Sequence, residues 1–502
     1  MILIEEANTR RNIFYKYFVD EESGKKTLIK TVEITCESAI IKKDEYHILY
    51  DSNMVPIQDA FKFINYKFLT SSPNTKLQAI SALRILYSFL ELFDLEINDL
   101  TDDDIENLKY FLRGFSPKGS HITIDLKTDR SNNTINTYLA MFRKYTNFLN
   151  IQDSNLHKIS PVTNKTFIYG TDIKVETKTY VHNERVNKDK TVPRYISVPE
   201  YKKILEVIDK EYTIREKCIV RLMFEAGLRI GEVLGLTSED VKFKEFTNSK
   251  TGKKSKTGIV YLRNRVTDKK HQLVKGAIVP TTRRNYYNKS YKSSTERAYI
   301  TLDLYDLIEE YINNFHNLEN YKNKDKEVIG FDFLDAILNS ENKHDMKKKN
   351  DNSLELFKKN YKKYTITDIV DKKANIDADG STILEENFYI FINNLGKPLS
   401  IISWNEILRE IFKKSGLSLD SDKREHNLNH RFRHGFAMYL VRELKQPLVE
   451  VQRRLRHKSS KSTEVYFRPT DDDIATAQEE FSKSLEDRLV AQVPEGSFDE
   501  NE

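Results

Sequence analysis

The chain of 502 residues has room for about two to four domains, each with its own hydrophobic core. Its 81 basic and 76 acidic residues leave a net charge of +5, which does not by itself indicate a nucleic-acid-binding protein. No run approaches about 18 apolar residues and no secretion signal is visible, which excludes a membrane-spanning or disulfide-rich secreted protein. We therefore expect a soluble, cytoplasmic chain in which Cys36 and Cys218 are free, buried thiols.

Residues 1–60 are predicted to form a small unit of their own. Two β-prone runs between residues 13 and 35 flank the turn dipeptide Ser23-Gly24, a pattern that predicts a β-hairpin. These residues alone give no indication of the unit's role.

Residues 61–152 are predicted to form a compact helical bundle, because apolar residues recur there at helical spacing. Asn133 or Thr134, within "RSNNT", is the predicted cap of the last helix. The three predicted helices lie around residues 80–90, 100–114 and 138–149.

Residues 153–195 are polar and basic, and are predicted to be a linker that passes into extended structure. A solvated linker and one lying against nucleic acid both fit this composition. A further domain is expected over residues 196–470, because Ser197 can cap a helix that has Pro199 in its first turn. The next predicted helix stops at Gly227.

The domain at 196–470 also contains β-type sequence and an insertion. Residues 258–302 hold two β-prone runs separated by a long basic stretch. The insertion at about 315–385 includes "KHDMKKKNDN", which is typical of a solvated segment, with a DNA contact as the alternative. Residues 471–502 are expected to form one amphipathic helix and an acidic tail. The predicted fold class is mainly α with a small β-sheet or hairpin in the 196–470 domain (α+β).

The first segment that could carry chemistry is "GLRIGEVLGL", which begins at Gly227. Arg229 lies there in a tight bend between two glycines. A guanidinium group held close to the backbone can face an anion with two donors. Pairing of Arg229 with Glu232 is the alternative.

The second segment, "HNLNHRFRHGFAMYL", places His430 and Arg433 three residues apart. At that spacing they share one face of a helix and make a pair of phosphate-directed donors. His434 is predicted to lie on a different face. A surface cluster of charges is the alternative.

The third segment is "LRHKSSKSTEVYF". A predicted helix with an apolar stripe ends near His457, which could simply interact with the helix dipole. Tyr466 follows nine residues later, after a connection rich in serine and threonine.

The residue types in these segments suit phosphoryl transfer without a cofactor. No metal-ligand spacing, phosphate-binding glycine loop or Ser-His-Asp arrangement stands out, so no cofactor or metal is expected. Arginines neutralise the non-bridging oxygens of a phosphodiester in the transition state. A phenol can attack phosphorus and become a covalent ester. The leaving 5′-oxygen needs a proton from a Lys or His, which contributes roughly 10²–10⁴-fold to the rate.

The three segments together, in this order, resemble the tyrosine recombinase (phage integrase) family over roughly residues 65–475. The resemblance implies an active site made of Arg229, His430, Arg433, His457 and the nucleophile Tyr466. It also implies a catalytic lysine in a β-hairpin, and "YKSSTERAYITL" points to Lys292, with Lys289 as the alternative. Arg456 departs from the family pattern, because it stands where a glycine is usual.

Further expectations come from the same resemblance. Residues 61–152 are similar to the family's DNA-binding core-binding domain, and many integrases carry an accessory DNA-binding unit at the position of residues 1–60. The implied partners are double-stranded DNA, a homotetramer on paired sites and accessory DNA-bending proteins. The enzyme would be cytoplasmic and nucleoid-associated when bound to DNA, without cofactor, metal or membrane.

The expected function is site-specific DNA recombination through a 3′-phosphotyrosyl intermediate. The length and the N-terminal residues favour a mobile-element integrase or transposase. Two alternatives use the same scaffold: DNA relaxation of the type IB topoisomerase kind, and a DNA-binding protein without catalysis.

Overall fold

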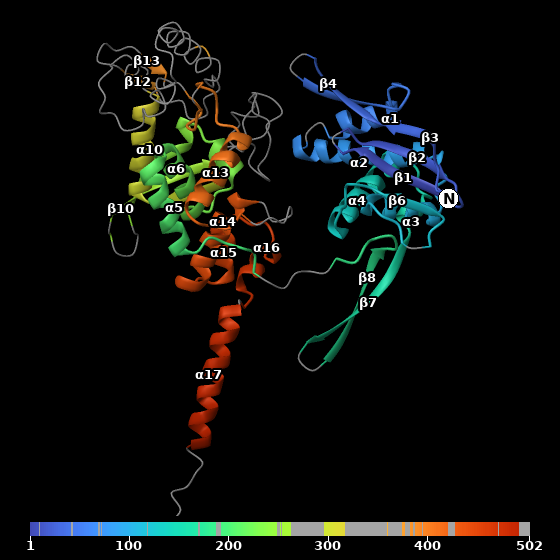
Figure 1. The fold of residues 1–502 in the computed structure, drawn as a ribbon. Helices are drawn as coiled ribbons and strands as arrows, with labels where there is room; N and C mark the ends of the chain where they lie inside the picture. Colours follow the sequence, from blue (N-terminus) through green and yellow to red (C-terminus); the bar gives the residue numbers. More distant parts are fainter. Residues whose placement is uncertain are drawn as a thin grey trace, which may run out of the picture. The chain divides into compact units, whose positions relative to one another are not determined.

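The computed structural model divides the chain into two compact units, Met1–Lys188 and Asp189–Glu502, each of which is described by itself (Figure 1). Within the described residues, no helix is both long enough and apolar enough to span a membrane. The structure describes residues 1–9, 11–41, 44–68, 71, 73–117, 119–168, 171–186, 192–247, 252, 254–262, 296–316, 359, 374–376, 382–384, 387–393, 395–419, 427–469 and 471–490.

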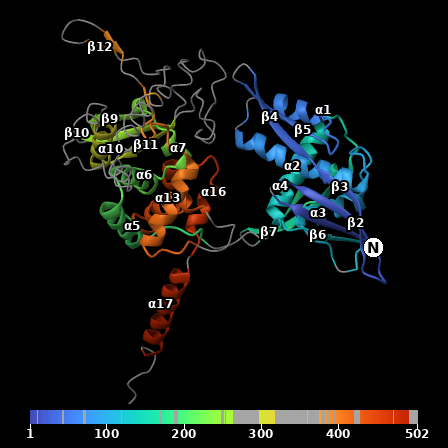
Figure 2. The same cartoon turned by 45° about the horizontal axis from the view of Figure 1, so that its top comes forward.

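The first six strands of the N-terminal unit form a four-stranded sheet and a separate hairpin. They are β1 (Ile2–Asn8), β2 (Ile13–Val19), β3 (Lys26–Glu33), β4 (Thr35–Ile41), β5 (Asp44–Tyr50) and β6 (Ile122–Asp125). The sheet order is β3-β2-β1-β6, in which only the β1–β6 pair is parallel. The hairpin predicted between residues 13 and 35 is confirmed as β2 and β3. β4 pairs with β5, which lies against the helix that follows it (Figure 2).

The helices of the N-terminal unit confirm the three predicted from periodicity. They are α1 (Gln58–Lys62), the π-helical turn η1 (Phe63–Lys67), α2 (Pro73–Phe93), α3 (Asp102–Arg113), α4 (Asn132–Phe148) and the short 3₁₀ turn η2 (Asn155–His157). The cap of α4 is Ser131, whose hydroxyl accepts from the backbone N–H of Thr134 (3.4 Å). The predicted caps Asn133 and Thr134 are therefore wrong. Both lie inside the first turn, whereas Ser131 has the extended backbone that a cap requires.

Residues 1–60 share a core with these helices, so the prediction of a unit of their own is wrong. Phe14 of β2 packs against Phe111 of α3, with ring centroids 4.9 Å apart, in one continuous hydrophobic core. The ammonium groups of Lys16 and Lys30 each donate to a carbonyl in the last turn of α2 (2.6 Å each). The sheet's apolar face needs a partner to exclude water, and the helices supply it.

The extended structure expected within 153–195 is a hairpin of β7 (Ile159–Ile168) and β8 (Thr171–Tyr180). The chain after the hairpin returns to α3, because Nε2 of His182 lies 3.0 Å from Oδ1 of Asp102.

In the C-terminal unit, α6 packs against α5, α7, α10 and α14 (Figure 1). Ser197 caps the first of these helices in a capping box with Glu200, as predicted. The bounds are α5 (Val198–Glu211), α6 (Ile214–Glu225), α7 (Ile230–Leu234), the 3₁₀ turn η3 (Ser238–Asp240), α10 (Leu302–Phe315), α13 (Ile401–Lys414) and α14 (Leu428–Met438).

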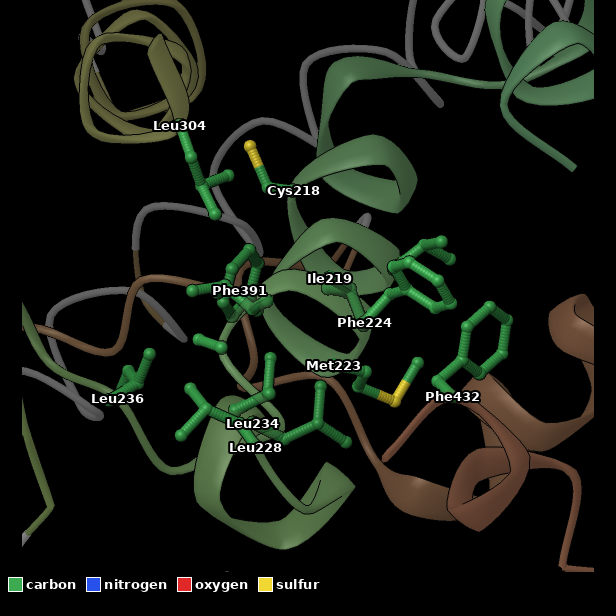
Figure 3. Packing of buried hydrophobic residues seen from close by; sticks show 14 of the residues in the cluster. Cys218, Ile219, Met223, Phe224, Leu228, Leu234, Leu236, Leu304, Phe391 and Phe432 are labelled. Atoms are coloured by element: carbon green, nitrogen blue, oxygen red, sulfur yellow. The ribbon is translucent and has the colours of Figure 1, made fainter. Parts of the chain in front are cut away.

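The core of this unit places apolar residues of α6 between the neighbouring segments. Met223 and Phe224 lie beside Phe432 of α14, and Cys218 lies toward Leu304 of α10 (Figure 3). Cys218 is buried and free, as predicted. Cys36 is also free but only half-buried, so the prediction of burial is wrong for that thiol.

The β-type sequence at 258–302 is confirmed in a small antiparallel sheet of order β11-β10-β9. Most of the insertion predicted at about 315–385 lies outside the described residues. The strands of the unit are β9 (Val241–Thr247), β10 (Lys254–Leu262), β11 (Glu296–Ile300), β12 (Ala374–Ile376) and β13 (Thr382–Leu384). The predicted class of mainly helical structure with small sheets is confirmed.

The C-terminal part of this unit is a series of short helices followed by one long helix. These are the π-helical turn η4 (Tyr439–Glu443), α15 (Leu448–Leu455), α16 (Lys461–Glu464), the 3₁₀ turn η5 (Val465–Phe467) and α17 (Asp471–Val490). The helix predicted after residue 470 is therefore present. Arg442 connects the start of α17 to the rest of the unit through its ion pair with Asp473.

Candidate active site

The segment "GLRIGE" folds into a tight turn that positions Arg229. Gly227 has a φ of +59°, and a Cβ there would lie 2.4 Å from Cδ1 of Phe436, so conformation and packing both require glycine. Arg229 is the N-cap of α7. Its backbone N–H donates to Oε2 of Glu232 (2.9 Å), and its Nη1 donates to Oε1 (2.7 Å). The pairing with Glu232 is thus present, and it holds the guanidinium at the turn.

Arg433 comes from the middle of α14, and 2% of the residue is exposed. Its Nη1 donates to the carbonyl of Gly227 and its Nη2 to the carbonyl of Leu455. These bonds join α14 both to the turn and to the end of α15. Burial, with repulsion from Arg229 and Arg456, lowers the pKa of Arg433 to about 9, so the group is still mostly charged at neutral pH.

Arg456, the departure from the family pattern, is the C-cap of α15 in a left-handed conformation with φ of 55°. Glycine adopts this backbone without strain, which explains why a glycine would suit the position. The side chain is nevertheless buried, with 5% exposed. Its Nη2 donates to the carbonyl of Gly227 (3.1 Å) and to Oε2 of Glu232 (3.3 Å). Arg456 therefore brings a third guanidinium beside Arg229 and Arg433.

These three arginines and Glu232 form what we call the arginine cluster. Burial alone would raise the pKa of the Glu232 carboxyl, but the charges of Arg456, Arg229 and Arg433 outweigh burial and lower it. One carboxylate against three guanidinium groups leaves a net charge of two in a largely dehydrated place. An anion with several oxygens, such as a phosphodiester, would offset this charge and use the planar donors.

His457 follows Arg456 directly, just after the end of α15. Its backbone N–H donates to the carbonyl of Gln452 (3.1 Å), and its Nδ1 lies 2.9 Å from Oγ1 of Thr463. Its ring is nearly parallel to that of Tyr466, at an angle of 14° with centroids 6.4 Å apart. The end of α15 thus places His457 next to Arg456 in the chain and its ring near that of Tyr466.

Tyr466 lies in η5 with 3% of the residue exposed, and its ring belongs to a small core with residues of α14 and α15. Its hydroxyl is hydrogen bonded to Nδ1 of His434 (2.7 Å). Burial raises the pKa of Tyr466 to about 12, against the nearby charges of Arg433 and Arg229, which favour the phenolate. The ring is therefore packed in a core while its oxygen faces the charged groups.

The sequence analysis missed the contact of His434 with Tyr466, because it placed His434 on a different face of the helix from His430 and Arg433. The available signal was its spacing of four residues from His430, which puts both rings on one side of a helix. Their centroids lie 5.9 Å apart. Burial, followed by the charges of His430, Arg433 and His457, lowers the pKa of His434 to about 4.

The structure thus brings together five of the six predicted site residues: Arg229, His430, Arg433, His457 and Tyr466. Lys292 and its alternative Lys289 lie outside the described residues. Across the described part of the chain, no group of three or more His, Cys, Asp or Glu side chains could hold a metal ion.

A family model and several known proteins are similar to this chain. A model of the phage integrase family matches residues 194–289 and 332–473. Transposase A from transposon Tn554 of Staphylococcus aureus is 31% identical over 204 residues, which are 39% of this chain and 54% of the transposase. Tyrosine recombinase XerA of Pyrococcus furiosus is 35% identical over 98 residues, 17% of this chain and 34% of the recombinase. The chain therefore matches about half the length of the Tn554 relative, and less of XerA.

Among solved structures, the Tn1549 transposon integrase in complex with transposon right end DNA is 15% identical, with a TM-score of 0.41 over 84% of this chain and 98% of that chain. The first matched segment of the family model contains Arg229, and the second contains His430, Arg433, His457 and Tyr466. The chain belongs to the phage integrase family of tyrosine recombinases.

Proposed function

We propose that this protein is a site-specific DNA recombinase that cleaves and rejoins DNA strands through a 3′-phosphotyrosyl intermediate. The observation that carries the proposal is the convergence of a buried tyrosine hydroxyl and the arginine cluster, between the middle of α14 and the C-terminal end of α15. This arrangement combines a nucleophile with fixed positive charge, which are the two requirements of metal-independent phosphoryl transfer.

In the proposed reaction, Arg229 and Arg433 donate to the non-bridging oxygens of the scissile phosphate. The Tyr466 oxygen attacks phosphorus and gives up its proton to a base, the new Oη–P bond forms and the bond from phosphorus to the 5′-oxygen breaks. Lys292, or Lys289 in its place, gives the leaving 5′-oxygen a proton. The phosphotyrosine ester conserves the bond energy, so a second 5′-hydroxyl can reverse the reaction.

The proposed substrate is double-stranded DNA. The arginine cluster would bind one backbone phosphate, and residues 61–152 would supply further contacts as a core-binding domain. The residues before them would add accessory DNA contacts. A homotetramer on two paired sites, with accessory DNA-bending proteins, would complete the assembly.

The proposed biological role is movement of a mobile element. The similarity to transposase A of Tn554, which extends over 204 residues, supports this role over resolution of chromosome dimers. The enzyme would act on the ends of the element that carries its gene.

Covalent trapping tests the proposal. Nicked suicide duplexes that tile the DNA on both sides of the gene are incubated with the full chain, denatured and separated. We expect a DNA-linked protein band that depends on particular duplexes and disappears in Tyr466→Phe. Tyr439→Phe is the matched control, because it removes an exposed phenol that lies outside the site. Specific DNA binding without any such band would contradict the proposal and favour a DNA-binding protein without catalysis.

A further inference from the structure

We propose that His434 is a catalytic residue that receives the proton of the Tyr466 hydroxyl during DNA cleavage and returns it during rejoining. This inference rests on the proposed function. It assigns a role to the residue next to Arg433, which the family resemblance does not place in the active site.

The contact between the two residues has the geometry of proton transfer. Nδ1 of His434 lies 2.7 Å from the Tyr466 oxygen, with the ring centroids 5.6 Å apart. When the phenol donates, Nδ1 must be the acceptor, so the imidazole is neutral and carries its proton on Nε2. A general base has to lie within about 2.6–3.2 Å of the atom from which it takes the proton, and His434 does.

The backbone of α14 holds His434 rigidly. The next residue, Gly435, lies so close to the chain before α5 that a Cβ there would be 2.4 Å from the carbonyl oxygen of Ile196. The carbonyl of Arg431 also accepts from the N–H of Ile196 (3.1 Å). Because Arg433 is on the same helix, the phosphate donor and the proton acceptor are positioned by one rigid element.

The surroundings of His434 keep its imidazole ring unprotonated, so the ring can accept a proton. Burial comes first among the causes that lower its pKa to about 4, and the charged groups that face it are His430 and Arg433 from α14 and His457 after α15. The ring is therefore neutral at neutral pH. As the Oη–P bond forms, the phenolic oxygen becomes an ester oxygen and can no longer retain its proton. The negative charge of the bound phosphate favours the imidazolium at that moment.

His457 has a different arrangement from His434. Its Nδ1 interacts with Thr463 (2.9 Å), and its ring lies parallel to the phenol ring. It follows Arg456 of the arginine cluster, where the proposed function places the phosphate. The two histidines would thus divide the work: His457 acts on the phosphate, and His434 acts on the nucleophile.

The proposed step balances. The Oη–P bond forms, the bond from phosphorus to the 5′-oxygen breaks, the phenol proton moves to Nδ1 of His434, and the 5′-oxygen receives a proton from the general acid. In rejoining, a 5′-hydroxyl attacks the phosphotyrosine and His434 protonates the departing phenolate.

The test is single-turnover cleavage of a nicked suicide duplex by the full chain, with wild type, His434→Ala and His434→Asn. The Asn side chain places an amide near the position of Nδ1, so it can accept the phenol's hydrogen bond but cannot take its proton. We expect both variants to bind the duplex as wild type does and to cleave about 10²–10⁴-fold more slowly. Rejoining of a preformed adduct should slow as well.

A duplex with a 5′-phosphorothiolate at the scissile position separates the base from the acid. A thiolate leaves without protonation, so it should restore cleavage to a variant of the general-acid lysine. The ratio of wild-type to His434→Ala rates should stay the same on both duplexes, because attack by the nucleophile still needs a base.

Near-normal cleavage by His434→Asn would reduce His434 to a positioning residue and overturn the proposal, as would near-normal cleavage by His434→Ala. If His434→Ala fails to fold, His434→Asn decides the question. Lack of any adduct with the wild-type chain would instead contradict the proposed function itself.

Discussion

At the scale of single residues, the site gathers three guanidinium groups around the single carboxylate of Glu232. Glu232 accepts from Arg229 and from Arg456, while Arg433 is held by two backbone carbonyls. Carbonyl oxygens satisfy the donors of Arg433 without neutralising its charge. The arginine cluster therefore retains charge for a substrate anion, at the cost of repulsion between its members.

Arg433→Ala should slow single-turnover cleavage by about 10²–10³-fold, because it removes a fixed donor from the transition state. Duplex binding, measured by fluorescence anisotropy, should change little, since many phosphates contribute to affinity. Arg453→Ala on α15 is the matched control: its side chain is 77% exposed, and cleavage should be unaffected. Normal cleavage by Arg433→Ala would show that Arg433 is not a phosphate ligand.

Substitution of Arg456 separates backbone strain from side-chain contacts. Both Arg456→Gly and Arg456→Ala lose the bonds to Gly227 and Glu232, but only alanine keeps the strain of a left-handed backbone. We expect free energies of unfolding in the order wild type, Gly, Ala, with the Gly and Ala variants about 1 kcal/mol apart. Urea denaturation measures all three. A glycine variant more stable than wild type would mean that the left-handed backbone costs more free energy than the bonds of Arg456 to Gly227 and Glu232 contribute.

At the scale of elements, the site joins the ends of two helices to the middle of a third. The N-terminus of α7 carries Arg229, and the C-terminus of α15 carries Arg456 and His457. The carbonyl of Gly227, in the turn before α7, accepts from the guanidinium groups of Arg456 and of Arg433, which lies in the middle of α14. The geometry of the site therefore depends on two turns, at Gly227 and at Arg456, whose residues adopt the left-handed backbone conformation.

Gly227→Ala should disrupt the turn whose carbonyl accepts from Arg433 and Arg456. The added Cβ would need the left-handed backbone and would lie 2.4 Å from the Phe436 ring, so the turn that carries Arg229 must shift. We expect a loss of stability of a few kcal/mol and a loss of cleavage. Gly416→Ala is the control, because Gly416 has a similar φ of +67° and nothing within 4 Å of the added atom. It should cost only about 1 kcal/mol and leave cleavage intact.

Acid should destabilise the C-terminal unit partly through His316, at the end of α10. Its Nε2 lies 2.8 Å from the carbonyl of Ile390, and burial lowers its pKa to about 4. Since the unfolded chain takes up this proton near the ordinary histidine pKa of about 6.5, stability falls as the pH drops from 6.5 toward 4, and no penalty remains above 6.5. The full effect is about 3 kcal/mol.

His316→Gln keeps an amide that can donate to the carbonyl but does not titrate. Urea denaturation at several pH values should therefore show a smaller loss of stability for the variant than for wild type between pH 6.5 and 4. Equal losses in the two proteins would contradict the assignment to His316.

At the scale of the whole molecule, the chain contains separate hydrophobic cores in its two units. The N-terminal core extends from the sheet to α4 and η2, whereas the C-terminal unit has one core around α6 and another around Tyr466. A unit with its own core can fold by itself. The catalytic chemistry and the proposed contacts with more distant DNA are therefore separable.

A fragment of residues 189–502 should unfold cooperatively in urea, and it should bind duplex DNA more weakly than the full chain, because the contacts proposed for the N-terminal unit are gone. Circular dichroism and fluorescence anisotropy measure the two properties. A fragment without a cooperative transition would show that the C-terminal cores depend on the first unit. Unchanged DNA affinity would contradict the proposed role of residues 61–152.

The sequence by itself indicated the family, the helical character of both units and six candidate site residues, five of which lie in the described part of the chain, because those features reside in residue types and short spacings. Tertiary structure decided the rest. The contact of His434 with Tyr466 spans 32 residues, and that of Arg456 with Gly227 spans 229. The shared core of residues 1–60 and the helices after them likewise depends on how distant segments pack. No local sequence pattern encodes these long-range contacts, since they form only when the folded cores bring distant side chains together.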